Sequence, residues 1–325
     1  MYKRSNKKEY RIPQGITVGE KRIKIVQNST HSTDEFDPNK NRIEYTDKPK
    51  EHSESKEYVY DLPEAIIQDK SISEEAHKIR IKSSENLDNL SLEEVLTKLY
   101  HSSEKESPFG ASTQKYWAQR YRYFPDYDAG FLLDEEGLYS VCPAAISKSV
   151  MKYIKGVFKD QDSIVVADPM CGCGGMVLAA AASEKVEKVI ACDIDPLRIT
   201  IAYFNAKISG LEDKIQFIHC NSLELDTETL PKIDFVFTSP PWGSKFNRRV
   251  AFDPDLMPFG AKFYIKMCYR LSQNFGWLMP VDIMFKPLAI RMQQIDTELD
   301  QILYQVNILN GKPKTSMIFC GNKFK

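Results

Sequence analysis

Cysteine and tryptophan are missing from the first 110 residues of this 325-residue chain. No stretch of the sequence is apolar for long enough to cross a bilayer, so we expect no membrane helix. The basic start has no apolar segment behind it, which is not typical of a secretory signal. The net charge is only -1, so a surface that attracts a polyanion has to be local. Seven cysteines, an odd number, indicate reduced thiols in a cytosolic or nuclear protein.

The first 90 residues are dense in charged and small polar side chains, and their charges nearly balance. This composition predicts a mostly disordered tail at 1–90, which we expect to recruit protein partners and not to bind RNA tightly by charge. Ser91 and Glu94 form a capping box, and apolar residues then follow at helical spacing to Tyr100. We therefore expect a helical extension at 91–160 that packs against a catalytic core at 161–325.

The rest of the chain alternates short apolar runs with helical patterns, which predicts an α/β fold with a mostly parallel sheet of seven strands. Pro143 suits the first turn of a helix, which Gly156 is expected to close. The sequence Asn310-Gly311-Lys312 predicts a closing hairpin that adds one antiparallel strand at the sheet edge. The predicted strands are 163–167, 188–192, 215–218, 233–237, 277–279, 302–309 and 315–320, and the helices are 143–154, 176–183, 196–209 and 263–271.

A glycine-rich turn, DPMCGCGG, lies between the first predicted strand and its helix, the usual context of a cofactor loop. Val177 occupies the third glycine position of the dinucleotide pattern, so the loop does not match nicotinamide enzymes. Asp168 would repel a pyrophosphate but can lie near a cationic amino acid group, as in S-adenosylmethionine. Asp193, at the end of the second strand, is placed to hold ribose hydroxyls, and Asn221, after the third, to contact adenine. Each residue alone could instead serve a turn, but together they predict a nucleoside cofactor.

Cys171 and Cys173 invite a zinc hypothesis. Their C-x-C spacing is not the usual zinc spacing and no histidine lies nearby, so we predict no metal and interpret both as small side chains in a tight loop.

The fourth strand is followed by Ser239-Pro240-Pro241-Trp242, where two prolines must end the strand. Carbonyl groups around Ser239 and Pro240 are free to accept hydrogen bonds from an amine, and Trp242 can stack on a base. The predicted reaction is methyl transfer to an exocyclic amine, which needs mainly alignment of the reacting atoms. Trp242 could alternatively fill a core gap. Similar loops also occur in enzymes that methylate adenine N6 or cytosine N4.

The preceding block, KYWAQRYRYFPDYDAGFLLDEEGLYSVCP, resembles the stretch before the core of trimethylguanosine synthases, the RNA cap guanosine-N2 methyltransferases. The resemblance covers residues 115–243 and continues through DPMCGCGG, VIACDIDPLRI and SPPWG. It implies a class I (Rossmann-like) S-adenosylmethionine-dependent methyltransferase with a small N-terminal helical layer. The implied substrate is a small nuclear or nucleolar RNA with an N7-methylguanosine cap, and the implied setting is a monomeric protein of the nucleus.

The resemblance also implies roles for single residues. The methionine end of the cofactor is held by Asp168 and the 172–175 loop, its ribose by Asp193, and Phe124 packs near its adenosine. Trp242 stacks on N7-methylguanine, and Lys115 contacts the cap phosphates. The full expected cofactor set is Phe124, Cys142, Asp168, Cys171, Gly172, Gly174, Asp193 and Asn221, and the catalytic set is Ser239, Pro240 and Trp242.

The chain departs from the family pattern at three positions. Cys142 stands where the family usually has threonine, and Asn221 where it has aspartate. Val281 stands where the family has an arginine that contacts cap phosphates. Two alternatives therefore stay open: an adenine or cytosine amino-methyltransferase, and a catalytically weak cap-binding protein.

Overall fold

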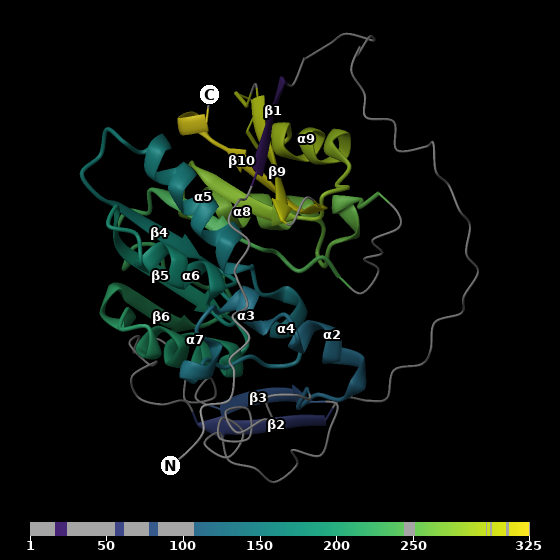
Figure 1. Cartoon of the computed structure of the whole chain (residues 1–325). Helices are drawn as coiled ribbons and strands as arrows, with labels where there is room; N and C mark the ends of the chain where they lie inside the picture. Colours follow the sequence, from purple (N-terminus) through teal and green to yellow (C-terminus); the bar gives the residue numbers. More distant parts are fainter. Residues whose placement is uncertain are drawn as a thin grey trace, which may run out of the picture.

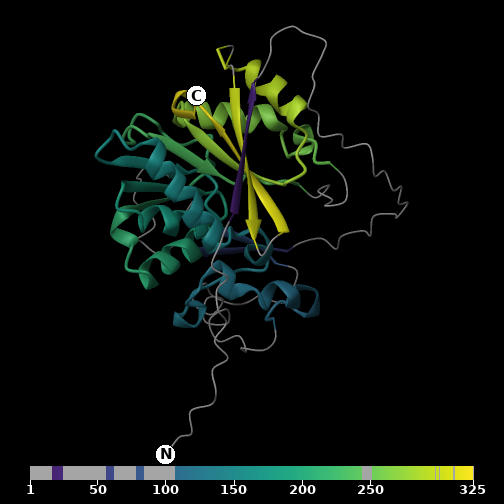
Figure 2. The same ribbon diagram turned by 45° about the horizontal axis from the view of Figure 1, so that its top comes forward.

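The computed structural model describes residues 17–24, 56–61, 78–83, 107–243, 251–296, 298–299, 301–309 and 312–324. Within them, eight strands form one twisted sheet in the order β1-β9-β10-β8-β7-β4-β5-β6 (Figures 1 and 2). The strands are β1 (Thr17–Lys24), β4 (Ile164–Asp168), β5 (Val186–Asp193), β6 (Ile215–His219), β7 (Phe235–Thr238), β8 (Phe275–Met279), β9 (Gln301–Leu309) and β10 (Lys312–Cys320). Seven of these are the predicted strands, so the predicted sheet is confirmed.

Strands β4 to β8 run parallel to one another. A helix follows β4, β5 and β7 and returns the chain to the opposite edge, whereas residues 220–234 connect β6 to β7 without a helix. Strand β10 is antiparallel to both neighbours, β8 and β9. The prediction of an antiparallel strand at the sheet edge is wrong, because β10 lies inside the sheet. Its residues Met317 to Cys320 are fully buried, and such an apolar run fits an interior strand covered on both faces.

The outer side of β9 pairs with β1, from the segment predicted to be a mostly disordered tail. Figure 2 shows β1, in purple, running beside β9. Strands β2 (Lys56–Asp61) and β3 (Lys78–Ser83) form a separate antiparallel pair. The helix predicted from Ser91 to Tyr100 lies outside the described residues.

Helices cover both faces of the sheet (Figure 1). On one face lie α5 (Ala144–Val157), α6 (Gly175–Ala181) and α7 (Pro196–Ile208), and on the other α8 (Ala261–Leu271) and α9 (Phe285–Gln293). The part of the extension that precedes α5 packs on the same face of the sheet as α5, α6 and α7. This part contains α2 (Gln114–Trp117), α3 (Arg120–Tyr123) and α4 (Gly137–Ser140). The side chains of Trp117 and Leu138 are almost completely buried in the core.

The helix α5 does not end at Gly156 as the sequence predicted. Gly156 is not among the glycines with a positive φ angle, and the helix continues to Val157. Phe158 then donates its N–H to the carbonyl of Ile154 at 3.0 Å, and both side chains are buried. Packing of these two residues therefore extends the helix past a glycine whose intrinsic preference opposes it.

Short 3-10 helices at Ala111–Thr113, Tyr127–Ala129, Glu212–Lys214, Pro254–Leu256 and Asn322–Phe324 complete the fold. Among the described residues, no helix has both the length and the apolar character that a membrane crossing needs.

Candidate cofactor and methyl-acceptor site

The carboxyl ends of three parallel strands bring predicted polar residues to one edge of the sheet. Asp168 ends β4, Asp193 ends β5, and Thr238 ends β7, next to Ser239. In an open α/β sheet, ligands bind in the crevice outside these strand ends. The predicted cofactor residues and the predicted acceptor loop therefore share one edge.

The glycine loop between β4 and α6 turns through left-handed backbone conformations. Gly172 has a φ angle of 53° and Gly174 one of 87°, values that favour glycine. A Cβ atom added at Gly172 would meet no heavy atom within 4 Å, so the loop faces open space there. A Cβ added at Gly175 would lie 2.7 Å from Val141 Cγ2 and 3.1 Å from the carbonyl oxygen of Cys142. One side of the loop is thus packed against the extension, while the other is open to a ligand.

Asp193 fixes the glycine loop to the end of β5. Its Oδ2 atom accepts a hydrogen bond from the N–H of Gly172 at 2.7 Å, and its Oδ1 atom accepts one from the N–H of Asp195 at 2.9 Å. The N–H of Cys171 donates to the carbonyl of Cys192 at 2.8 Å. Each carboxylate oxygen has two lone pairs, so each keeps one for a ribose hydroxyl.

Asp168 is only 4% exposed, and burial raises the pKa of its carboxyl from 3.8 to about 8. Its Oδ1 atom accepts a hydrogen bond from the N–H of Met170 at 3.2 Å. Burial also raises the pKa of Asp193, whose charge further disfavours ionisation of Asp168. Among the described residues, no lysine or arginine forms an ion pair with Asp168. The donor set therefore fits a cofactor that brings its own positive charge to this carboxylate.

The cysteines around the loop are buried thiols. Burial raises the pKa of Cys142 to about 12 and the pKa values of Cys171 and Cys173 well above their ordinary range. The Sγ atom of Cys173 donates to Asp134 Oδ1 at 3.2 Å. Within the described part of the chain, no group of three or more His, Cys, Asp and Glu side chains is arranged to hold a metal ion. Protonated thiols in this position serve as small packing groups.

Two links that the sequence analysis missed hold the extension against the cofactor loop. The first is Asn205 of α7, which is fully buried. Its Oδ1 atom accepts from the N–H of Leu132 at 2.8 Å, and its Nδ2 atom donates to the carbonyls of Leu132 and Cys173 at 3.0 and 2.9 Å. A single amide thus joins the extension, α7 and the glycine loop. A polar residue on an otherwise apolar helix face was the only sequence signal of this role.

The second link is an ion-pair cluster around Arg198, at the start of α7. Its Nε atom lies 3.2 Å from Asp134 Oδ2 and 3.7 Å from Asp195 Oδ2, and its Nη2 atom contacts Glu136. Asp195 also caps α7, because its Oδ1 atom accepts from the N–H of Leu197 at 2.9 Å. The acidic run at 134–136 is therefore matched to one arginine from the core, a pairing that sequence spacing could not reveal.

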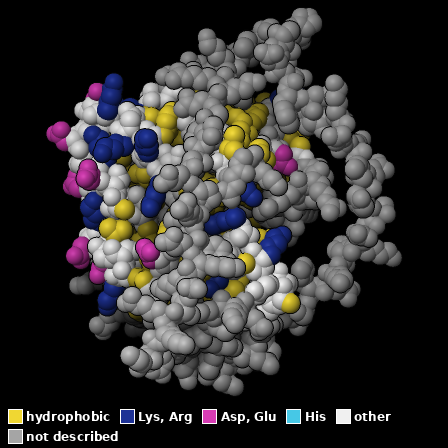
Figure 3. Space-filling model, in the orientation of Figure 1, with side chains coloured by type: hydrophobic (Ala, Val, Ile, Leu, Met, Phe, Trp, Pro, Cys, Tyr) yellow, Lys and Arg dark blue, Asp and Glu magenta, His cyan; other side chains and the backbone are white. Residues whose placement is uncertain are grey.

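The extension also places Phe124 and Lys115. Phe124 is 3% exposed and stacks on Phe131, with ring centroids 4.8 Å apart and an interplanar angle of 13°. Lys115 is exposed on α2, and its Nζ atom lies 4.7 Å from the ring centroid of Tyr116. Figure 3 shows acidic and basic side chains mixed on the left of the molecule, with basic ones also near the centre, above α2–α4. This pattern agrees with a near-neutral chain whose basic surface is local.

The loop after β7 carries the predicted acceptor residues. Pro240 is buried, whereas Ser239 and Trp242 are half-buried. The indole Nε1 atom of Trp242 donates to the carbonyl of Leu278 in β8 at 3.3 Å, and its ring packs partly against the core. The hydroxyl of Thr238 is buried without a hydrogen-bond partner. One edge of Trp242 is thus anchored, and the loop remains partly open.

A model of the family described as RNA cap guanine-N2 methyltransferase matches residues 163–323. The chain is also 32% identical over 192 residues to a trimethylguanosine synthase of Schizosaccharomyces pombe, an alignment that covers 56% of this chain and 76% of that protein. This chain belongs to the RNA cap guanine-N2 methyltransferase family. The fold is therefore that of a class I S-adenosylmethionine-dependent methyltransferase. Membership of this family indicates that the chain transfers methyl groups to RNA.

Two further similarities are more limited. The chain is 33% identical over 82 residues to the U6 snRNA (guanine-N(2))-methyltransferase THUMPD2 of Bos taurus, which covers 25% of this chain and 16% of that protein. A solved structure, described as human methyltransferase 10 domain containing protein, shares 14% identity with a TM-score of 0.46 and covers 64% of this chain and 97% of that one. The fold assignment rests on the sheet order and the family match and not on that score.

Two residues of this family member lie at the rim of the shared edge. The Oδ1 atom of Asn221 accepts from the N–H of Leu223 at 3.1 Å, so this side chain closes a turn after β6. Val281 follows β8 and is half-buried, and its carbonyl accepts a hydrogen bond from the hydroxyl of Tyr304 at 2.8 Å. The structure thus places an apolar side chain where the family pattern has an arginine.

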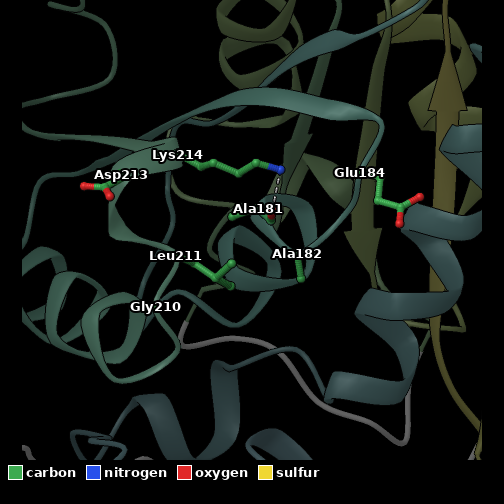
Figure 4. Close-up of a pocket in the computed structure, with 7 residues that line it drawn as sticks. All are labelled: Ala181, Ala182, Glu184, Gly210, Leu211, Asp213 and Lys214. Atoms are coloured by element: carbon green, nitrogen blue, oxygen red, sulfur yellow. Dashed lines mark hydrogen bonds between the residues drawn. The ribbon is translucent and has the colours of Figure 1, made fainter.

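A cavity of about 300 Å³ lies far from this chemistry, where α6 and α7 end. Its lining, shown in Figure 4, consists of Ala181, Ala182, Glu184, Gly210, Leu211, Asp213 and Lys214. The Nζ atom of Lys214 donates to the carbonyls of Ala181, Ser183 and Val186 at 3.0 to 3.2 Å. Because α6 begins at the cofactor loop, its other end lies at the opposite edge of the sheet. Lys214 therefore caps the end of α6 and takes no part in the cofactor site.

Proposed function

We propose that this protein methylates the N2 amine of the N7-methylguanosine cap of RNA, forming m2,7G, m2,2,7G or both. Family membership supports the reaction type. The observation that carries the choice of substrate is the Ser239–Trp242 loop, with an anchored but half-buried tryptophan at the edge that also carries Asp168 and Asp193. An aromatic face beside a cofactor site suits a flat, cationic base.

The cofactor site divides into three tasks. S-adenosylmethionine, when bound, supplies a methyl group that is activated by a sulfonium. Asp168 and the loop from Cys171 to Gly174 hold its methionine end, and Asp193 holds its ribose. Phe124, Cys142 and Asn221 border the adenosine side, where Phe124 acts through its stack with Phe131 and Cys142 through its contact with the loop.

Catalysis on the acceptor side needs position more than acid or base. Carbonyl oxygens near Ser239 and Pro240 accept hydrogen bonds from the amine and orient its nitrogen lone pair toward the methyl group. Alignment of this kind replaces a bimolecular encounter with an ordered approach and lowers the barrier without a strong base. For each methyl group transferred, one proton would leave the nitrogen for solvent, and the cofactor would leave as the neutral thioether S-adenosylhomocysteine.

Substrate selection rests on Trp242 and Lys115. N7-methylguanine is cationic, so stacking on tryptophan gains about 1–2 kcal/mol beyond stacking of a neutral base. That difference corresponds to a roughly 5- to 30-fold preference for N7-methylguanine over guanine. The exposed ammonium of Lys115 contacts the cap phosphates.

The cellular assignments are part of the same proposal. The substrates are capped small nuclear or nucleolar RNAs, the protein acts in the nucleus as a monomer, and its N-terminal segment recruits protein partners.

The test is methyl transfer from labelled S-adenosylmethionine to m7GTP, to GTP and to a short uncapped RNA. We expect transfer to m7GTP and not to the other two. Transfer to uncapped RNA would instead identify an adenine or cytosine amino-methyltransferase. Binding of m7GTP without transfer would instead identify a cap-binding protein.

A further inference from the structure

Phe259 is the most exposed large apolar side chain among the described residues, with 81% of its surface accessible. Its φ angle of 65° is the only positive one outside glycine in the described part of the chain. A bulky residue in this region of backbone space is strained, and such strain persists only where the surroundings impose it. Glycine would be the relaxed choice, as it is at Gly260, where φ is 73°. The sequence thus places an exposed phenylalanine at a position whose backbone conformation favours glycine.

The segment before Phe259 is firmly held. The N–H of Phe252 donates to the carbonyl of Asp282 at 2.9 Å, and the N–H of Met284 donates to the carbonyl of Phe252 at 2.8 Å. Asp255 forms an ion pair with Arg291 at 2.7 Å, and Met257 is buried. The conformation at Phe259 is therefore imposed by an ordered framework.

This segment touches the acceptor loop directly. A Cβ atom placed on Gly243, the residue after Trp242, would lie 3.2 Å from Cδ of Pro258, the residue before Phe259. With about 3.8 Å between successive Cα atoms, the Cα atoms of Trp242 and Phe259 lie within roughly 15 Å of each other. Strands β7 and β8 are parallel, so α8 must start at the carboxyl edge of the sheet, and Phe259 stands just before it. Both aromatic residues belong to the same rim.

The ring of Phe259 is supported for stacking. It lies against Phe263 in the first turns of α8, with centroids 5.0 Å apart and an interplanar angle of 28°. Lys262 and Lys266, one turn apart on α8 and on either side of Phe263 in the sequence, are exposed. Aromatic platforms flanked by basic side chains are how proteins bind single-stranded nucleic acid, because bases stack on the rings while the cations meet phosphates.

We infer that Phe259 is a second stacking platform, which holds a base of the RNA strand that follows the nucleotide bound at Trp242. The inference rests on the proposed function, because it requires RNA to enter at the Trp242 loop. It goes further by assigning a contact with the body of the RNA. Phe259 thereby makes a capped RNA a better substrate than the free cap nucleotide.

The test compares the unaltered 325-residue chain with Phe259→Gly, Phe259→Trp and Ile208→Ala. The glycine variant removes the ring and relieves the backbone, so its thermal stability should not fall. Ile208 is exposed at the last residue of α7, the end that lies away from the cofactor edge of the sheet, and serves as a control for loss of a surface apolar group. The readouts are kcat/KM for m7GTP and for a capped ten-nucleotide RNA, and the Kd of the uncapped ten-nucleotide RNA.

We expect Phe259→Gly to lower the ratio of kcat/KM for capped RNA to kcat/KM for m7GTP about fivefold or more, the effect of losing one stacked base. The Kd of uncapped RNA should rise by a similar factor. Phe259→Trp should retain the wild-type ratio, and so should Ile208→Ala.

An unchanged ratio and an unchanged Kd in Phe259→Gly would overturn the inference. An equal loss with m7GTP and capped RNA would also overturn it, since the ring would then act on the cap site. If the wild-type protein failed to methylate m7GTP, the proposed function would fail, but the Kd of uncapped RNA would still decide the role of Phe259.

Discussion

The two halves of the carboxyl edge are built in different ways. On the side of β4 and β5, both aspartates are nearly buried and accept backbone N–H groups, and Asn205 and Arg198 lock the adjoining extension in place. On the side of β7 and β8, the described residues offer a half-buried Trp242, held by one indole hydrogen bond, and an apolar Val281.

This contrast separates the residues proposed to bind the cofactor from those proposed to recognise the target base. A cofactor that is the same for a whole enzyme class can be met by a fixed set of buried polar groups. A target base is recognised by a few side chains on loops, where substitutions are tolerated more easily. The cofactor half should therefore respond to mutation through cofactor affinity and stability, and the acceptor half through discrimination between bases.

The strongest way to break the cofactor half is Asp193→Ala. The change leaves the N–H groups of Gly172 and Asp195 without their acceptor and removes the proposed ribose ligand. Loss of the first two acceptors should lower stability, whereas loss of two ribose hydrogen bonds to a charged group, each about 1.5–3 kcal/mol, should lower affinity for S-adenosylmethionine about 100-fold or more. Calorimetry measures the affinity, with Asp213→Ala at the opposite sheet edge as the carboxylate control. Wild-type affinity in Asp193→Ala would remove this residue from the site.

The corresponding change in the acceptor half is Trp242→Ala. It should weaken m7GTP binding about 10- to 100-fold, because stacking and its cationic component are both lost. Cofactor affinity should stay within about twofold of wild type, and Trp242→Phe should recover part of the loss. Fluorescence titration with m7GTP and GTP gives the comparison. Equal weakening of both nucleotides would mean that Trp242 supports the fold and does not recognise the methylated base.

The pH dependence of cofactor binding sharpens the electrostatic difference. Burial raises the pKa of Asp168 from 3.8 to about 8, so the folded apoprotein holds this proton more tightly than the unfolded chain. Apoprotein stability should therefore fall as pH rises from about 4 to 8. A cationic cofactor needs the ionised form, so its affinity should rise about tenfold per pH unit between roughly pH 6 and 7.5.

Calorimetry across this pH range, with Asp168→Asn alongside, checks the assignment. The asparagine variant should bind weakly and without this slope. The same slope in both proteins would place the titrating group elsewhere.

A gain of function tests whether the acceptor half is incomplete. Val281→Arg restores the residue of the family pattern, and its guanidinium should form charge-assisted bonds with cap phosphates. Affinity for m7GTP should rise about 3- to 10-fold at low salt and less at high salt, whereas affinity for the N7-methylguanosine nucleoside should not change. Val281→Leu controls for side-chain volume. An equal gain for nucleotide and nucleoside would contradict a phosphate contact.

The smallest expected effect concerns Thr238, at the end of β7 in the acceptor half. Its buried hydroxyl has no partner, so Thr238→Val should raise the stability of the apoprotein by about 1 kcal/mol. Chemical denaturation with and without S-adenosylmethionine measures it. A marked loss of stability would show that the hydroxyl is satisfied in solution.

Several elements of the fold were predictable because local signals and burial agree. The apolar runs that became β4 and β5 are bounded by glycine, proline and charged residues, and buried parallel strands have this pattern. The cofactor loop could be predicted because its glycines lie directly between a strand and a helix. The sequence predicted the position of Asp193 but not its bond to Gly172, which depends on how the loop folds back.

Other elements depend on contacts that no local pattern encodes. The position of β10 between β8 and β9 depends on the whole sheet. The hairpin signal therefore predicted that the strand exists but not where it lies in the sheet. Helix α9 was missed because Pro287 lies in its first turn, where the absent N–H does no harm. Asn205 forms a hydrogen bond with Leu132, 73 residues away in the sequence, and Arg198 forms one with Asp134, 64 residues away.

The most direct test of the account is the position of the transferred methyl group. A capped RNA is methylated with labelled S-adenosylmethionine, digested to nucleosides and analysed by mass spectrometry against m2,7G, m2,2,7G, N6-methyladenosine and N4-methylcytidine. The account predicts label in m2,7G or m2,2,7G, and its loss in Trp242→Ala. Label in N6-methyladenosine or N4-methylcytidine would contradict it and show that the loop at Trp242 accepts a different base.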